Sequence, residues 1–180
     1  MDEGNIFLVG MMGAGKTTVG RALARRLGRP FVDCDKEIVQ RTGVPVATIF
    51  EIEGEAGFRR RESETLFQIA ATPGQVIATG GGAVIVPANR DLMRRNGTVV
   101  YLRVSVDRLV ERTARDTARP LLAGVDRRRT LETLLTAREP LYREVAHLVI
   151  ESAGQSPGAL AGRLAEALHR QTPRPPDPSS

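Results

Sequence analysis

Short apolar runs alternate with longer amphipathic segments along this chain. Residues 5–9 form an apolar run that stops at a glycine, and residues 17–27 then carry apolar side chains at helical spacing. Further strand-like runs follow at residues 31–32, 75–78, 98–102 and 147–150. Because strands separated by helical segments are typical of a parallel sheet covered by helices, the pattern predicts an α/β fold.

Helical spacing fills most of the intervals between these runs. Helices are expected from the second strand to residue 43, over 45–71, from about 106, over 126–138 and around 160–168. Gly54 should interrupt the helix over 45–71, and Pro140 should either end or kink the helix over 126–138. The length of 180 residues suits one compact domain, which we place at residues 1–171.

Two segments lack this periodicity. Residues 112–124 are polar and rich in arginine, which is typical of a surface loop. Residues 172–180 contain four prolines and no apolar pattern, so they are expected to be a disordered tail.

The charge of the chain is basic, with a formal net charge of +5. Only Lys16 and Lys36 are lysines among the 26 basic residues, which indicates a general bias toward arginine. The chain has no tryptophan, and only 4% of its residues are aromatic. Because no recognition motif or continuous basic stripe with aromatics accompanies the charge, nucleic acid is not expected as a partner. A nucleotide-dependent switch protein that binds nucleic acid is kept as an alternative function, from a class other than the small-molecule enzymes.

Cysteine content and hydropathy bear on the compartment. Cys34 is the single cysteine and cannot form an internal disulfide. Neither a signal-peptide pattern nor an apolar run of membrane-spanning length is found. We therefore expect a cytoplasmic protein without a membrane partner.

A phosphate-binding motif lies between the first strand and the first helix. Residues 10–17 read GMMGAGKT and match G-x-x-x-x-G-K-[ST] in full. The glycines let backbone N–H groups turn inward, and the helix N-terminus adds partial positive charge. Lys16 is expected to reach the β and γ phosphates of ATP, and the Thr17 hydroxyl to join a Mg²⁺ shell. The predicted ATP contacts of the loop are Gly13, Ala14, Gly15, Lys16, Thr17 and Thr18.

A magnesium–nucleotide site also needs a carboxylate, and the third strand runs into Thr79 and three glycines without one. The nearest candidates are Asp33 and Asp35, at the end of the second strand. A spacing of two along an extended strand would point both side chains to one side. We assign Asp33 to the metal, and Asp35 to the acceptor hydroxyl as a ligand or base. The glycines Gly80–Gly82 offer a floor on which a substrate could approach the backbone closely.

Phosphoryl transfer commonly uses a mobile cation that closes over the phosphates. The arginine-rich segment 112–124 has the polarity of such a lid. Similar clusters at residues 59–61 and 127–129 carry the same charge. The residue pattern alone therefore leaves open which arginines bind anions and what the acceptor is.

A set of motifs in order along residues 5–169 resembles the shikimate kinase family. They read GKTT at 15–18, DCD at 33–35, IF at 49–50, GE at 54–55, FR at 58–59, GGG at 80–82, RPLL at 119–122, and R-x-PLY at 138–142. The resemblance implies a three-layer α-β-α P-loop kinase of the nucleoside-monophosphate-kinase type, with strand order 2-3-1-4-5 and a mobile lid. It further implies transfer of the ATP γ-phosphoryl group to the 3-hydroxyl of shikimate, in the pathway to chorismate and aromatic amino acids.

The resemblance also implies roles for individual residues. The residues similar to the shikimate-binding set are Asp35, Arg59, Gly80, Gly81, Gly82 and Arg138, within substrate-binding helices at about 35–72 and beyond. The nucleotide side resembles the family at Arg119, the lid arginine, and at Arg112 and Pro157 near the adenine. Thr17 looks like the direct Mg²⁺ ligand, Asp33 like a ligand through water, and Glu62 like a residue that orients the arginines.

Three points stay open from the sequence. A related kinase for aminoshikimate or gluconate would share the nucleotide half, although paired arginines favour a carboxylated acceptor. Cys34, between the two aspartates, could react with thiol reagents or could only pack. A monomer is what the family resemblance implies.

Overall fold

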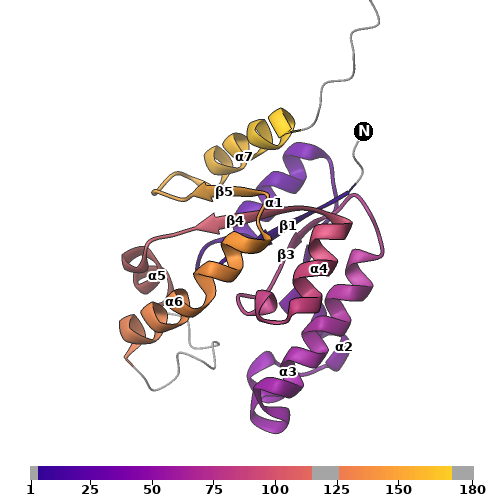
Figure 1. Cartoon of the computed structure of the whole chain (residues 1–180), viewed down its shortest axis with the longest axis vertical. Helices are drawn as coiled ribbons and strands as arrows, with labels where there is room; N and C mark the ends of the chain where they lie inside the picture. The colour runs from indigo at the N-terminus through magenta and orange to yellow at the C-terminus, as the bar shows by residue number, and fades with distance from the viewer. Residues whose placement is uncertain (1–3, 115–125, 172–180) are drawn as a thin grey trace, which may run out of the picture.

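Figure 1 shows the computed structural model, which describes residues 4–114 and 126–171. Parallel strands form a five-stranded sheet in the order β2-β3-β1-β4-β5. The strands are β1 (Asn5–Val9), β2 (Phe31–Asp33), β3 (Val76–Ala78), β4 (Gly97–Arg103) and β5 (Leu148–Glu151). The α/β class and the strand order are therefore confirmed.

Helices cover both faces of this sheet and make the outer two layers. On one face α1 (Lys16–Leu27) packs against α7 (Pro157–Gln171). The remaining helices are α2 (Cys34–Thr42), α3 (Val46–Ala70), α4 (Pro87–Asn96), α5 (Val106–Thr113), α6 (Arg127–Val145) and the 3₁₀ turn η1 (Ala83–Ile85). Helices α3, α4 and α6 lie on the opposite face, with α2 against α3 and α5 against α6.

Several expectations about the helices can be compared with the structure. Gly54 does interrupt α3, with φ 70° and ψ −179°. Pro140 does not end α6, which continues to Val145. Helix α4 was not expected, although Pro87 at its first turn is a helix-start signal. The expected lid lies outside the described residues beyond Ala114, and the expected tail at 172–180 lies outside them entirely.

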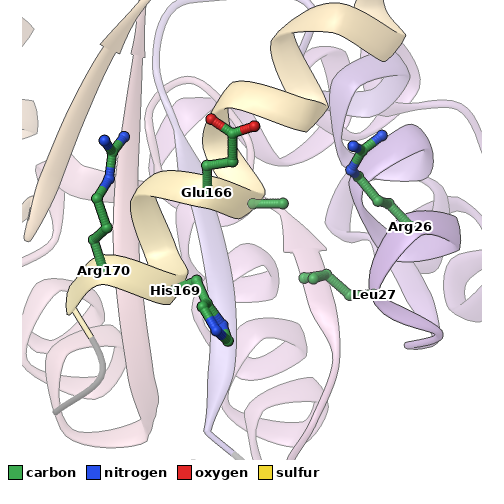
Figure 2. A pocket seen from close by; sticks show the side chains of 6 residues that line it. Arg26, Leu27, Glu166, His169 and Arg170 are labelled. Atoms are coloured by element: carbon green, nitrogen blue, oxygen red, sulfur yellow. The ribbon is translucent and has the colours of Figure 1, made fainter. Parts of the chain in front are cut away.

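The C-terminal ends of α1 and α7 leave a hollow of about 550 Å³ between them (Figure 2). Arg26, Glu166 and His169 are among the side chains that line it. Because α1 has 12 residues, this end lies about 16 Å from its N-terminus, where the phosphate motif is. The hollow is therefore separate from the phosphate-motif end of the helix.

In the parts of the chain that the structure describes, no helix has the length and apolar character to span a membrane.

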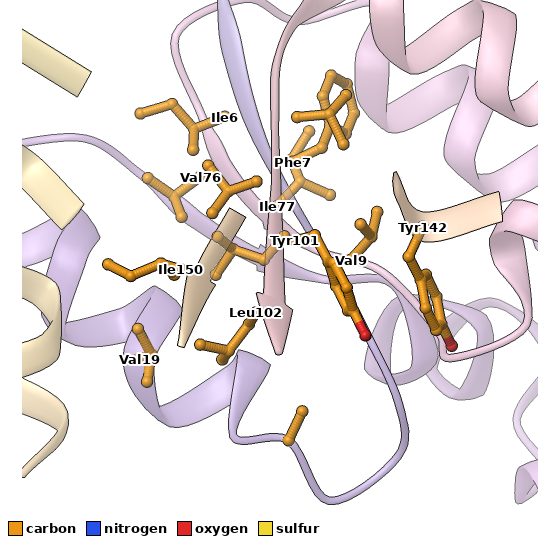
Figure 3. Close-up of a cluster of buried hydrophobic side chains, with 14 of the residues drawn as sticks. Ile6, Phe7, Val9, Val19, Val76, Ile77, Tyr101, Leu102, Tyr142 and Ile150 are labelled. Atoms are coloured by element: carbon orange, nitrogen blue, oxygen red, sulfur yellow. The ribbon is translucent and has the colours of Figure 1, made fainter. Parts of the chain in front are cut away.

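The core fills the space between the sheet and both helical layers (Figure 3). Phe7, Ile77 and Leu102 from three neighbouring strands are almost fully buried. Such apolar runs, covered on both faces, are typical of parallel strands. On one side of the sheet the rings of Tyr101 and Tyr142 stack with centroids 5.0 Å apart. The core thus fixes α6 against β4.

Asn5 is a buried polar residue that ties three elements together. Its Nδ2 donates to the Ala70 carbonyl at 3.2 Å, and its Oδ1 accepts from the Gln75 backbone N–H at 2.9 Å. We expect Asn5→Ala to lower the free energy of unfolding by about 2 kcal/mol, because buried backbone groups lose their partners. Urea titration should show no comparable loss for Asn96→Ala, whose side chain donates to Leu92 within α4. Equal stabilities of the two variants would contradict this role.

Candidate active site

The loop between β1 and α1 holds its lysine close to its own backbone. Lys16 is 9% exposed, and its Nζ donates to the carbonyls of Gly10 at 2.7 Å and Met11 at 2.9 Å. Gly13 has φ 78°, and a Cβ there would lie 2.7 Å from the Thr113 methyl. Only glycine suits both conditions. The end of α5 therefore packs directly on the loop.

Thr17 and Asp33 lie side by side next to the loop. The Thr17 hydroxyl donates to Asp33 Oδ2 at 2.7 Å, and Asp33 Oδ1 accepts from the Lys36 backbone N–H at 3.2 Å. Asp33 is thus the N-cap of α2 as well as the last residue of β2. The expectation that Asp33 and Asp35 share one side of an extended strand was wrong, because Asp35 lies in the first turn of α2.

Despite this difference, both aspartates line one cavity with the phosphate loop. The cavity has a volume of about 210 Å³ and is also lined by Lys16, Thr17 and Gly81. The helix turn after Asp33 brings Asp35 to the same space that the strand spacing was expected to reach. Within the described ranges, no cluster of three or more His, Cys, Asp or Glu residues could hold a metal ion. A divalent cation here would need phosphate and water oxygens in addition.

The glycines after β3 leave room for charged side chains from two helices. A Cβ on Gly80 would lie 2.4 Å from Glu62 Oε2 and 3.2 Å from Asp35 Oδ1. A Cβ on Gly82 would lie 2.2 Å from Nη2 of Arg59. Asp35 comes from α2, whereas Glu62 and Arg59 come from α3. We call this strip the glycine floor (Gly80–Gly82). Because it has no side chains, the charged groups from α2 and α3 can lie against its backbone.

Arg138 approaches the middle of the glycine floor from α6. A Cβ on Gly81 would lie 3.4 Å from Arg138 Nη1 and 3.2 Å from the backbone nitrogen of Met12. The space beside the Gly81 Cα is therefore bordered by both the arginine and the phosphate loop. The Tyr142 hydroxyl donates to the Gly81 carbonyl from one turn further along α6. Arg138 is only 3% exposed.

Charge around the glycine floor is only partly paired. Arg59 Nη1 donates to Glu62 Oε1 at 2.9 Å. Arg59 Nε, Glu62 Oε2 and Arg138 Nη1 are buried and have no hydrogen-bond partner. Burial raises the pKa of Glu62, and the charge of Arg59 opposes that rise. Because buried guanidinium groups are costly without partners, two of them with open donors suit an anionic ligand such as a carboxylate.

A second cavity lies on the other side of the phosphate loop, with a volume of about 280 Å³. Its lining includes Gly15, Thr18, Arg112, Ser152, Gln155 and Pro157. Arg112 Nη1 donates to the Ala14 carbonyl at 2.9 Å, and its Nη2 donates to the Ser152 hydroxyl at 3.4 Å. The structure thus brings Arg112 and Pro157, the two residues expected near the adenine, together with Thr18 of the phosphate loop.

The sequence-predicted residues therefore fall into two groups around one loop. Arg119 was expected as the lid arginine and lies outside the described residues. Ser152, Gln155 and Tyr142 were not singled out as site residues. For Tyr142 the signal was its place in the R-x-PLY motif, whereas Ser152 and Gln155 carry no pattern of their own.

The comparisons with known proteins agree with this geometry. A family model described as shikimate kinase matches residues 12–169. The shikimate kinase of Nitrosospira multiformis is 56% identical over 165 residues, which cover 92% of this chain and 85% of that protein. That of Dechloromonas aromatica is 60% identical over 149 residues, covering 83% and 81%. A structure of shikimate kinase from Acinetobacter baumannii in complex with shikimate has 46% identity and a TM-score of 0.93, covering 95% and 96%.

The phosphate loop at the end of β1, in a sheet of order 2-3-1-4-5, defines a P-loop kinase that uses ATP. The match of the family model extends over most of the chain, and the identities to curated relatives exceed half over that length. The chain belongs to the shikimate kinase family.

The position of Cys34 favours packing over reactivity. The side chain is 1% exposed, and burial, with Asp35 as the leading charge, raises the pKa of its thiol. We expect a disulfide reagent to label the native protein about 100-fold more slowly than the urea-unfolded chain, because reaction requires local opening. Because the chain has a single cysteine, the absorbance of the thiol that a chromogenic disulfide reagent releases measures the labelling of Cys34 directly. Rapid stoichiometric labelling of the native protein would contradict this expectation.

Proposed function

We propose that this chain phosphorylates the 3-hydroxyl of shikimate through the two cavities described above, with Mg²⁺ and ATP. The observation that carries the proposal is the convergence of Asp35, Arg59 and Arg138 at the glycine floor, beside the phosphate loop. Two guanidinium groups can bind a substrate carboxylate, and a carboxylate can bind a hydroxyl. The roles of these residues, and a monomeric cytoplasmic form without nucleic acid, are part of the proposal.

On the nucleotide side, the loop backbone, Lys16 and Thr18 bind the phosphates of ATP, and Arg112 and Pro157 border the adenine. The Thr17 hydroxyl, with Asp33 through water, would hold Mg²⁺, which would supply positive charge to the phosphates of ATP. The fit rests on the 2.7 Å pairing of these two oxygen groups beside Lys16. Lys16 exchanges its bonds to the loop carbonyls for bonds to phosphate oxygens.

On the acceptor side, Arg59 and Arg138 hold the carboxylate, and Asp35 orients the hydroxyl. The acceptor oxygen forms a bond to the γ phosphorus, and the bond from that phosphorus to the β–γ bridging oxygen breaks. The hydroxyl proton leaves toward the Asp35 carboxylate, and ADP takes the electron pair. Positioning and fixed charges supply most of the rate, because both reactants are held at one sheet edge.

The acceptor is tested by ADP release in the presence of MgATP. We expect turnover with shikimate to exceed that with no acceptor, gluconate or AMP by about 100-fold or more, because only shikimate offers a carboxylate and hydroxyl in a matching ring. Aminoshikimate is the closest competitor. Equal or faster turnover with aminoshikimate or gluconate would assign the chain to the corresponding alternative.

Asp35→Asn is expected to lower kcat by roughly 10²–10⁴, since the carboxylate that orients and accepts from the hydroxyl is lost. ATP affinity, measured by calorimetry, should stay nearly unchanged because Asp35 lies on the acceptor side. Asp91→Asn, at an exposed position of α4, is the matched control. If Asp35→Asn turned over as fast as the parent, its proposed role would be wrong.

A further inference from the structure

Tyr142 is a buried phenol that the proposed reaction does not use. It lies on α6 one turn after Arg138, and its side chain is fully buried. Its hydroxyl donates to the carbonyl of Gly81, the middle residue of the glycine floor. The bond joins α6 to the strip between β3 and η1, which are otherwise distant in sequence.

Arg138 lies close to this hydroxyl along α6. The two residues are four positions apart, a spacing that places side chains next to each other on a helix. Burial raises the pKa of Tyr142, and the charge of Arg138 opposes that rise, as expected for a guanidinium near the phenol. Arg138 Nη1 has no partner and lies near Gly81, which leaves it free for a ligand. Tyr142 thereby ties Gly81 to the helix that carries this open donor.

The Tyr142 ring is itself fixed from behind. It stacks on Tyr101 with centroids 5.0 Å apart and an interplanar angle of 23° (Figure 3). The Tyr101 hydroxyl donates to Glu139 at 2.7 Å, and Arg143 donates to Glu139 at 2.9 Å. The stacked ring thus presents its hydroxyl to the Gly81 carbonyl, and this bond keeps the glycine floor next to the turn of α6 that carries Arg138.

We propose that Tyr142 is a positioning residue for the acceptor site, which fixes the Arg138 guanidinium relative to Gly81 and so determines affinity for a carboxylated acceptor. This inference rests on the proposed role of Arg138 in acceptor binding. It adds a residue that touches neither substrate and acts through two groups that do.

The test is Tyr142→Phe, which removes the hydroxyl and keeps the stacked ring. Calorimetry should show shikimate binding about tenfold weaker, since loss of the bond to Gly81 lets the glycine floor and the Arg138 guanidinium move relative to each other. KM for shikimate should rise by the same factor while kcat stays within about twofold, because the hydroxyl contacts none of the groups proposed to act on the transferred phosphoryl group. MgATP affinity should not change.

Tyr101→Phe is the matched control, because it removes an equally buried phenol hydroxyl whose partner is Glu139 and not the floor. Tyr101→Phe should keep a shikimate affinity near that of the parent. This should hold even if the melting temperatures of Tyr101→Phe and Tyr142→Phe fall by the same amount. Equal shikimate affinity in Tyr142→Phe and the parent would overturn the inference. Equal losses of shikimate affinity in Tyr142→Phe and Tyr101→Phe would also overturn it. So would a loss of MgATP affinity in Tyr142→Phe as large as its loss of shikimate affinity, since either result indicates a structural role only.

Arg138→Lys separates this inference from the proposed function. Loss of shikimate binding in Arg138→Lys, with no change in Tyr142→Phe, would reject the positioning role alone. Unchanged shikimate binding in Arg138→Lys would reject the acceptor site, and the role of Tyr142 with it.

Discussion

The site depends on one constraint, which is that charged side chains lie directly against the glycine backbone of the glycine floor. Gly80–Gly82 follow β3, and groups from α2, α3 and α6 come so near that most Cβ atoms there would collide with them. The space gained is filled by buried guanidinium and carboxylate groups. Their cost in an apolar interior is offset only where a ligand or a partner supplies the missing bonds.

The sheet brings the glycine floor to the phosphate loop. β1 and β3 are neighbours and run parallel, so the phosphate loop after β1 and the glycines after β3 emerge at one edge. Gly81 is the point of contact, because both Met12 of the loop and Arg138 border the space that a side chain at Gly81 would fill. In the proposed reaction, this arrangement lets the donor phosphate and the acceptor hydroxyl meet without any large movement of the sheet.

The sequence predicted the parts of this site that local chemistry determines. The phosphate loop could be recognised because glycine spacing sets its backbone, and the strand order came from the family resemblance. Asp33 and Asp35 reach one cavity, but through a helix cap and not along a strand, since side-chain capping outweighed the extended pattern. Glu62 was assigned from the family resemblance, and Tyr142 belongs to a family motif without an expected role. The contacts of both depend on how α3 and α6 pack on the sheet, which local sequence does not determine.

The most direct measurement is equilibrium binding of shikimate to Gly82→Ala by calorimetry. The added methyl group would lie 2.2 Å from Arg59 Nη2 and must displace that guanidinium. Gly158→Ala is the control, because a Cβ there meets nothing within 4 Å. We predict that Gly82→Ala binds shikimate about tenfold or more weakly, with MgATP affinity unchanged. Parental shikimate affinity in Gly82→Ala would contradict the account of the glycine floor.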